Sequence, residues 1–394
     1  MPHVYAHAVE LVTTALAVIA LGYTLASLVA AYIYLARRSA QLRRQAQTPF
    51  APPVTILKSL KGLDPEMLDA FRSHCRQTYA GEYELLFGVG SMDDPAVAAV
   101  RQLQQEFPGL PIRLLECPKK LGANGKISTL IQLVPHARHK YLLINDSDIT
   151  VSPRYLERVM ACFAPAEKRI GLVTALYRGR AHRTIASRLE SMGISTDFFP
   201  SLLLAIVLER GIRFGLGSTL CVSRDALEAA GGLEPLVDLL ADDYELGVRV
   251  YKVGFGLAIA PEPVETSVPA YNWRGFLDHQ IRWYRTIRDA RPGGYCGLIF
   301  TYALPVALLN VLASGLSPLS LWLLALTFFL RLTVAMTVGV RILGDHQVLP
   351  NLWLLPFRDI AAIALWAAGF AGNTIVWRGQ RFEVRKGRLE KLVQ

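Results

Sequence analysis

The chain has 394 residues, a formal net charge of +10, and 19% charged against 52% hydrophobic residues. Its mean hydropathy is +0.30. These values exclude a disordered chain, a disulfide-rich miniprotein and an ordinary soluble enzyme, and they favour a protein that is part globular and part embedded in a membrane. A basic balance on so apolar a chain indicates anionic lipid or a phosphorylated substrate, and no nucleic acid, as the partner.

The N-terminal region contains an apolar run without charge from Leu11 to Leu35. It is long enough to cross a hydrocarbon core of roughly 30 Å. It is too long for a signal-peptide core, and no positive residue precedes it. Arg37, Arg38 and further arginines follow it directly, so the positive-inside rule places the next segment in the cytosol. We expect a transmembrane helix over residues 1–36 and a basic linker over 37–51.

A second membrane region is expected over residues 293–377, with two or three spans, followed by a basic tail over 378–394. Gly297–Leu330 has no charged residue, and its Ser314–Pro318 stretch predicts a break between two helices. A further apolar segment runs from Ile360 to Trp377. One span plus three would place both termini on one side, whereas the N-terminus is expected outside and the basic tail inside. One segment is therefore re-entrant or interfacial, and Leu349–Pro356 is another candidate for this.

The middle of the chain, residues 52–292, predicts a globular α/β domain. Helical patterns alternate with short apolar runs, which implies βαβ units and a mostly parallel central sheet. In such sheets ligands bind beyond the carboxyl ends of the strands. The expected strands are Val54–Leu57, Glu84–Val89, Ile112–Leu115, Tyr141–Asn145, Gly171–Thr174 and Leu257–Ala260. The chain's five cysteines are an odd number without CxxC spacing, and we expect isolated thiols in a reducing compartment.

The first chemical motif is Asp146-Ser147-Asp148, which follows the apolar strand over residues 141–145. Two carboxylates one residue apart at a strand end can ligate a hard divalent ion. Such an ion can bridge the two phosphates of a nucleotide donor and neutralise the charge of a leaving diphosphate. The alternative interpretation is an Asx-type turn.

Two further acidic pairs each allow a functional and a structural interpretation. Asp93 and Asp94 could hold a nucleoside, or they could cap the helix that begins near Pro95. Asp242 and Asp243 open a helical pattern, and like charges side by side raise at least one pKa, which suits a general base. The alternative for the second pair is again a helix start that the dipole favours.

Two basic segments complete the set. Lys126 ends a loop of small residues, Gly122–Lys126, at the start of a helix, which suits contact with an anion. The segment from His279 to Arg285 carries Arg282 and Trp283, and a cationic helix flanked by aromatic side chains can bind phosphate. The alternative is an interfacial helix on anionic lipid. Both interpretations of this helix can hold together.

Taken together, the motifs resemble the membrane-bound ceramide glucosyltransferases and their bacterial relatives, which include hopanoid-associated glycosyltransferases. Their order and spacing along nearly the whole chain are more specific than any single motif. The stretches that carry the resemblance are 54–62 with Asp64, Asp93–Ala96, Gly122–Lys126, Asp146–Asp148, Ala230–Leu233, Asp242–Tyr244, Ile281–Trp283 and Trp377–Arg381. The resemblance implies a GT-A fold, a UDP-sugar donor, Mg²⁺ or Mn²⁺, inversion at the anomeric carbon and a lipid acceptor.

The resemblance also implies a role for each matching residue. Asp93 and Asp94 would contact the nucleotide, with Lys126 also at the donor. Asp146 and Asp148 would hold the metal and diphosphate, and Asp243 would be the catalytic base. Arg282 and Trp283 match a (Q/R)xxRW element beside the diphosphate and acceptor. Two positions depart from the family pattern: His279 stands first in that element, and Ser91 stands where many relatives have a further acid.

The sequence thus predicts transfer of glucose or N-acetylglucosamine from a UDP-sugar to a primary hydroxyl of a ceramide- or hopanoid-type lipid. The protein would be a multi-pass protein of a bacterial inner membrane with a cytosolic catalytic domain. The apolar run Phe198–Val207 is expected to dip into the interface, its alternative being a buried helix. The alternative functions are a processive polysaccharide synthase, a polyprenyl-phosphate sugar transferase and a non-catalytic membrane subunit.

Overall fold

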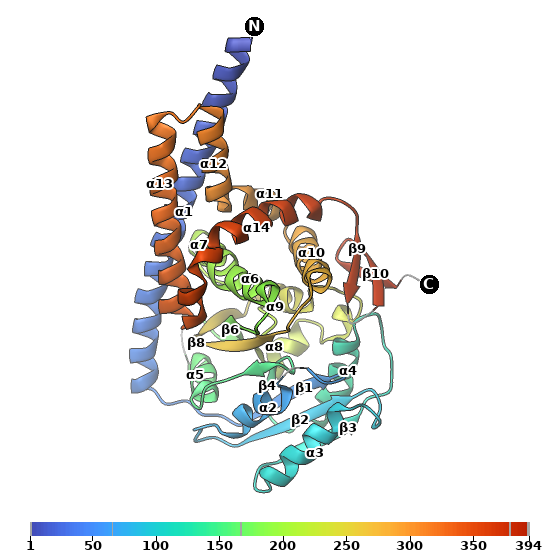
Figure 1. The fold of residues 1–394 in the computed structure, drawn as a ribbon. Helices are drawn as coiled ribbons and strands as arrows, with labels where there is room; N and C mark the ends of the chain where they lie inside the picture. The colour runs from blue at the N-terminus through green and yellow to red at the C-terminus, as the bar shows by residue number, and fades with distance from the viewer. Residues whose placement is uncertain (1, 65, 166–167, 378–379, 392–394) are drawn as a thin grey trace. The chain divides into compact units, whose positions relative to one another are not determined.

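The computed structural model describes residues 2–64, 66–165, 168–377 and 380–391. The chain folds into two compact units (Figure 1). The helical unit comprises Met1–Arg37, Arg178–Arg210 and Val268–Arg381, and the sheet unit comprises Arg38–Tyr177, Gly211–Ser267 and Phe382–Gln394. Each unit has a hydrophobic core of its own.

An eight-stranded sheet in the order β3-β2-β1-β4-β7-β6-β8-β5 organises the sheet unit. Strands β1 to β4 run parallel, and β7 is antiparallel to both β4 and β6. This confirms the predicted α/β class with its parallel core and every predicted strand. The strands are β1 (Val54–Leu60), β2 (Tyr83–Val89), β3 (Ile112–Glu116), β4 (Tyr141–Ile144), β5 (Ile149–Thr150), β6 (Ile170–Ala181), β7 (Leu220–Ser223) and β8 (Gly256–Val268).

Helices cover both faces of this sheet, as the apolar strands require. In β1, Ile56 faces one core and its neighbour Leu57 faces the other. The first core is shared with α2 (Met67–Cys75), α3 (Ala96–Glu106) and α5 (Tyr155–Met160), and the second with α4 (Gly125–Leu133), α8 (Arg224–Ala229) and α9 (Asp242–Lys252). The parallel strands thus bring their carboxyl ends to one edge.

The helical unit contains long apolar helices. Within the described part of the chain, four are long and apolar enough to cross a membrane: Tyr5–Gln47, Ile185–Leu208, Pro318–Ile342 and His346–Gly369. A fifth candidate is the pair Pro292–Thr301 and Ala303–Ala313, bent by 56°. The α-helices are α1 (Pro2–Gln47), α6 (Ile185–Gly193), α7 (Phe199–Leu208), α10 (Trp273–Ala290), α11 (Pro292–Gly297), α12 (Ala303–Ala313), α13 (Pro318–Val334) and α14 (Leu355–Gly369).

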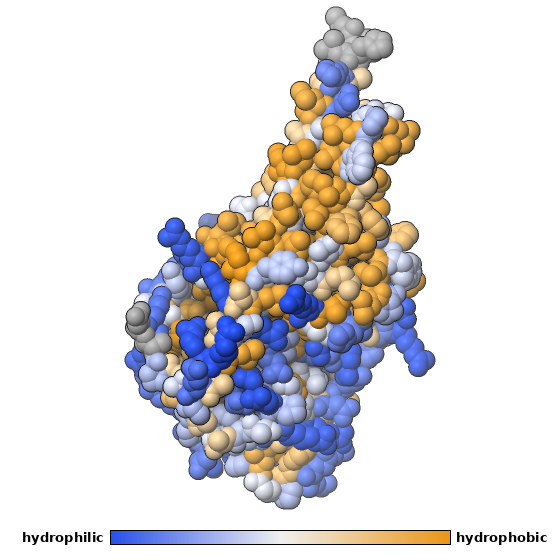
Figure 2. All heavy atoms as spheres, turned by 90° about the vertical axis from the view of Figure 1, so that its left-hand side faces the viewer, coloured by the Kyte–Doolittle hydropathy of each residue, from blue (hydrophilic) through white to orange (hydrophobic). Residues whose placement is uncertain are grey.

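Apolar side chains gather on the outer surface of α1, α12 and α13 (Figure 2). Leu11, Leu312 and Trp322 are 66%, 78% and 75% exposed, respectively. Contiguous apolar surface of this extent is unfavourable in water and typical of contact with lipid or a partner. Helices α1 and α13 also belong to helices of membrane-spanning length, and α12 reaches that length only together with the bent segment before it, so the surface is that of a membrane region.

Two sequence expectations for the C-terminal region need correction. The apolar segment Ile360–Trp377 is not one helix, because α14 ends at Gly369 and strand β9 (Thr374–Trp377) follows. Gly372 takes a left-handed φ of +75°, and the β-branched residues after it favour an extended strand. Within the region expected as a plain tail, β10 (Gln380–Arg385) and β11 (Arg388–Lys391) form a hairpin. Arg378 and Gly379 lie outside the described residues.

Two other expectations concern segments that lie inside apolar helices. Phe198–Val207 lies mostly in α7, where Phe199 and Leu203 are fully buried within the unit. This matches the buried-helix alternative more closely than a dip into the interface. Leu349–Pro356 forms part of the apolar helix His346–Gly369. The break expected at Ser314–Pro318 separates α12 from α13, where Gly315 and Leu316 both take positive φ.

Candidate active site

Asp146 and Asp148 follow β4 at the carboxyl edge of the parallel strands. The Asp146 Oδ1 lies 2.5 Å from the Lys126 Nζ. The Asp148 Oδ2 accepts a hydrogen bond of 2.5 Å from the Thr266 hydroxyl. Burial, and then the negative charge of Asp146, raise the pKa of Asp148 to about 6. The two carboxylates therefore form a crowded negative site that a positive ligand would stabilise.

Lys58 is a buried residue beside this site. It was not among the predicted site residues. It is 1% exposed, and its Nζ donates a hydrogen bond of 2.9 Å to the backbone carbonyl of Asp146. Burial lowers the pKa of Lys58 to about 7, although Asp148 and Asp146 oppose the shift. The sequence could have indicated Lys58, because it is a lysine inside an apolar strand and a buried ammonium group requires a partner.

The loop before α4 joins Lys126 to the Asp242–Asp243 pair. Asn124 caps α4, because its side-chain oxygen accepts from the backbone N–H of Ile127 at 3.2 Å. Its amide nitrogen donates to the Asp242 Oδ1 at 3.2 Å. The Lys126 Nζ lies 3.9 Å from the Asp242 Oδ2. Burial alone would lower the pKa of Lys126, but the carboxylates of Asp146 and Asp242 raise it above its ordinary value.

Asp242 and Asp243 begin α9, in agreement with the predicted helix start. Burial and the adjacent charge of Asp242 raise the pKa of Asp243 to about 6. The side chain lies against Gly217, where a Cβ atom would stand 3.0 Å from the Asp243 Oδ2. Asp243 is thus a packed, partly desolvated carboxylate that is ionised at neutral pH and can still bind a proton, as a general base requires.

Asp93 and Asp94 lie at the start of α3. Asp94 accepts hydrogen bonds from the backbone N–H groups of Gly62 and Ala96 at 3.0 and 2.9 Å, which corresponds to the capping alternative. Asp93 is exposed, and its carboxylate accepts a weak hydrogen bond of 3.4 Å from the Ser91 hydroxyl.

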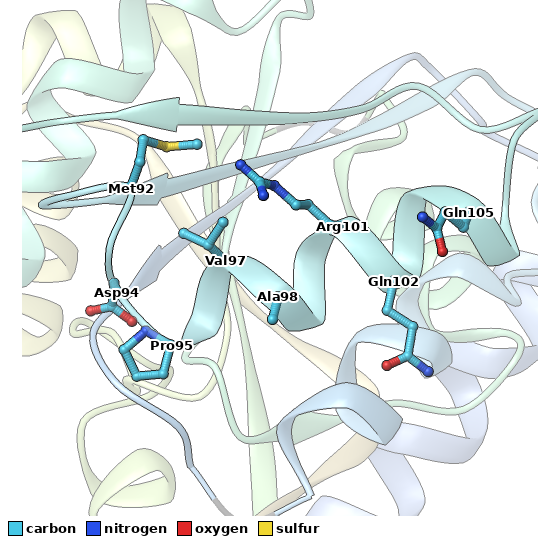
Figure 3. Close-up of a pocket in the computed structure, with 8 residues that line it drawn as sticks. All are labelled: Met92, Asp94, Pro95, Val97, Ala98, Arg101, Gln102 and Gln105. Atoms are coloured by element: carbon cyan, nitrogen blue, oxygen red, sulfur yellow. The ribbon is translucent and has the colours of Figure 1, made fainter.

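An open pocket of about 730 Å³ lies along α3 (Figure 3), lined by Met92, Asp94, Pro95, Val97, Ala98, Arg101, Gln102 and Gln105.

Arg282 and Trp283 lie on α10 of the helical unit, whereas the carboxylates above lie in the sheet unit. The Trp283 ring is 5.5 Å from that of His279 and 6.2 Å from that of Phe198. The His279 Nδ1 lies 3.0 Å from the Glu190 Oε2. The atypical first residue of the (Q/R)xxRW element therefore pairs with a buried carboxylate of α6.

The donor set suits a divalent cation that is shared with a substrate. Within residues 2–64, 66–165, 168–377 and 380–391, no three His, Cys, Asp or Glu side chains converge to form a closed metal cage. Mg²⁺ is commonly bound through one or two carboxylates together with substrate phosphates and water. Asp146 and Asp148 provide such carboxylates, and their mutual repulsion favours a cation between them.

Comparison with known proteins identifies the family. The sequence model of glycosyl transferase family 21 matches residues 12–390 of this chain. The chain belongs to this family. Ceramide glucosyltransferase 1 of Caenorhabditis elegans is 23% identical over 350 residues, covering 86% of this chain and 73% of the relative. Ceramide glucosyltransferase 3 of the same organism is 24% identical over 354 residues, covering 85% and 73%.

A solved structure of mannosyltransferase PcManGT from Pyrobaculum calidifontis, in complex with GDP-Man and Mn²⁺, is also similar. It is 18% identical with a TM-score of 0.47, and the match covers 90% of this chain and 99% of that one. Membership of family 21, with the eight-stranded sheet and the apolar helices, establishes a membrane glycosyltransferase of the GT-A class. The family resemblance found in the sequence is confirmed.

Proposed function

We propose that this family 21 member transfers one hexose, glucose or N-acetylglucosamine, from a UDP-sugar to a hydroxyl of a membrane lipid, with inversion and with Mg²⁺ or Mn²⁺. The observation that carries the proposal is the convergence of Asp146, Asp242 and Asp243 around Lys126. Asp148 adds a further carboxylate beside Asp146. Such a site pairs negative charge for a cation with a separate carboxylate for proton removal.

The chain's own residues define the steps. Asp146 and Asp148 would hold the divalent ion, which when bound neutralises charge on the donor diphosphate. Asp243 accepts the proton of the acceptor hydroxyl, and the oxygen attacks the anomeric carbon opposite the leaving UDP. A single displacement of this kind inverts the configuration. Lys126 keeps a fixed positive charge beside Asp146, and we assign Arg282 and Trp283 to the departing diphosphate, as the resemblance implies.

The lipid acceptor is supported by two independent observations. The matched relatives are named ceramide glucosyltransferases, and the described part of the chain contains four helices long and apolar enough to cross a membrane. We propose a ceramide- or hopanoid-type acceptor, which presents its hydroxyl at the interface. The same proposal places a catalytic domain over residues 52–292 in the cytosol, between membrane segments over 1–36 and 293–377, in a bacterial inner membrane.

The test uses the full-length protein in lipid nanodiscs with radiolabelled UDP-glucose or UDP-N-acetylglucosamine and added ceramide or hopanoid polyol. We expect one labelled sugar per lipid, with loss of transfer in EDTA and recovery in excess Mg²⁺ or Mn²⁺. A labelled polymer would indicate a processive synthase, and label on polyprenyl phosphate would indicate the other alternative. No transfer to any lipid would contradict the proposal.

A further inference from the structure

The C-terminal hairpin, formed by β10 and β11, is regularly paired and partly buried. Strands β10 and β11 pair in antiparallel register, with Arg385 opposite Arg388. The two residues between them, Lys386 and Gly387, have φ values of 50° and 77°. Two consecutive positive φ values are typical of the tight turns that match the twist of a hairpin. Val384 and Leu389 are opposite each other and are 1% and 4% exposed.

This hairpin extends its pairing to a second segment of the sheet unit. The backbone N–H of Leu389 donates to the carbonyl of Asp238 at 2.8 Å, and that of Leu240 donates to the carbonyl of Gly387 at 3.0 Å. Leu239 and Arg388 form an antiparallel bridge between these two bonds. Residues 238–240 thus add a short further strand beside β11, on the side away from β10 and β9.

The opposite side of this short strand supports the candidate active site. The backbone N–H of Ala123 donates to the Asp238 Oδ1 at 2.9 Å, and the side-chain amide of Asn124 donates to the carbonyl of Leu239 at 2.9 Å. The same Asn124 amide contacts Asp242. Gly122 approaches so closely that a Cβ atom would lie 2.6 Å from the Asp238 Oδ1. Residues 238–240 therefore connect the hairpin to the Lys126 loop.

We infer that the hairpin Gln380–Lys391 is a positioning element of the active site, which fixes the start of α9 and thereby Asp242 and Asp243 through residues 238–240. The inference rests on the proposed function for its kinetic consequence. Only two residues separate the last backbone contact, at Leu240, from the candidate base at Asp243. Displacement of a reacting group by about 1 Å can reduce a rate by roughly 10²-fold, so this short connection matters for catalysis.

The test compares Leu389→Pro with Leu389→Ala in the full-length protein. Proline removes the N–H that donates to Asp238, whereas alanine keeps this donor and removes the side chain. We expect Leu389→Pro to lower kcat at least about 10-fold relative to Leu389→Ala, with KM for the UDP-sugar within about 3-fold. Equal kcat in the two variants, or a loss through KM alone, would overturn the inference.

Hydrogen exchange provides a readout that does not depend on the reaction. We expect faster exchange at residues 238–250 in Leu389→Pro than in Leu389→Ala, and unchanged exchange in α2 and α3. Faster exchange in a protein without sugar transfer would support the hairpin contact and contradict the proposed function alone, whereas unchanged exchange overturns the inference.

A second pair of variants applies if the proline variant does not fold. Gly387→Ala strains the positive-φ turn whose Gly387 carbonyl accepts the hydrogen bond from the backbone N–H of Leu240. Gly109→Ala is its control, because Gly109 is in open space and has no positive φ. Exchange at residues 238–250 that rises only in Gly387→Ala supports the inference, and equal exchange in both overturns it.

Discussion

At the scale of single residues, the candidate site places two adjacent carboxylates in different surroundings. Asp242 lies beside Lys126 and Asn124, whereas Asp243 packs against Gly217. Burial and the Asp242 charge together raise the pKa of Asp243 to about 6. The raised value gives the base a stronger affinity for the acceptor proton while leaving it ionised at neutral pH.

The pH dependence of the reaction follows from this shift. A base must be deprotonated, so kcat/KM of the wild type should fall as the pH drops through about 6. In Asp242→Asn the repulsion between the two carboxylates is lost, so the pH at which kcat/KM falls should be lower than in the wild type. A pH–rate profile of both proteins checks this, with Asp69→Asn, a change at an exposed side chain of α2, as the control. A fall at higher pH in Asp242→Asn than in the wild type would contradict the assignment.

The sequence could identify some site residues but not their partners. The acidic pairs and Arg282 stand in motifs whose order along the chain is recognisable. Lys58, Asn124 and Thr266 contact these residues from distant segments, and each contact depends on how strands and loops meet in space. The capping role of Asp94 was an open alternative, because the same residue pattern suits a cap and a ligand.

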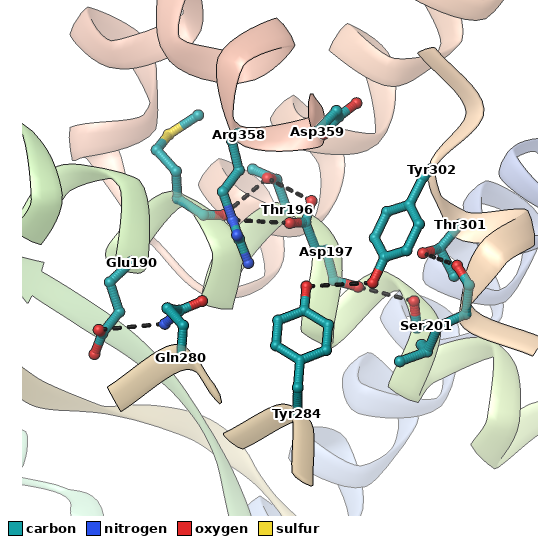
Figure 4. Close-up of polar contacts among 12 residues, drawn as sticks. Glu190, Thr196, Asp197, Ser201, Gln280, Tyr284, Thr301, Tyr302, Arg358 and Asp359 are labelled. Atoms are coloured by element: carbon teal, nitrogen blue, oxygen red, sulfur yellow. Dashed lines mark hydrogen bonds and ion pairs between the residues drawn. The ribbon is translucent and has the colours of Figure 1, made fainter. Parts of the chain in front are cut away.

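At the scale of elements, a buried polar network joins the apolar helices of the helical unit (Figure 4). Arg331 of α13 pairs with Asp359 of α14 at 2.7 Å and also with Asp197, which follows α6. The Arg358 Nε lies 3.0 Å from the Asp197 Oδ2. Two arginines thus balance two aspartates. Buried charges are costly unless they are paired, so we expect this network to restrict how these helices pack.

Breaking one partner of this network should destabilise the unit more than removing a matched pair. Arg331→Met leaves Asp359 buried without its main partner, and such losses cost about 3–5 kcal/mol. In Arg331→Met/Asp359→Asn the remaining Arg358–Asp197 pair is still neutral, so much of the loss should be recovered. Thermal unfolding in detergent checks this, and a double variant no more stable than Arg331→Met would contradict it.

The elements themselves were partly predictable. The apolar segments near both ends of the chain were recognised because their hydrophobic pattern spans many residues. The helix Ile185–Leu208 was recognised only in part, as the run Phe198–Val207. Strand β7 was missed because its four residues have no distinctive pattern outside the sheet, where they pair antiparallel to β4. The end of α14 was misplaced because the apolar character continues from the helix into β9, and hydropathy does not separate the two.

At the scale of the whole molecule, composition already indicated a chain that is part globular and part membrane-embedded. The exposed apolar side chains of α1, α12 and α13 are the structural counterpart of that composition. We expect the protein to remain in the membrane fraction through carbonate and high-salt washes, because apolar burial in lipid is not screened by salt. Immunoblotting of pellet and supernatant checks this, and release by carbonate would contradict integral insertion.

The central claim is that the acidic cluster of the sheet unit transfers a sugar to a membrane lipid. The most direct measurement is mass spectrometry of lipids from vesicles that contain the wild type or Asp243→Asn, supplied with UDP-sugar, ceramide or hopanoid polyol, and Mn²⁺. We expect a lipid heavier by one hexose or N-acetylhexosamine residue with the wild type, and about 10²–10⁴-fold slower formation with Asp243→Asn at equal protein. Wild-type turnover by Asp243→Asn, or no glycosylated lipid with the wild type, would contradict it.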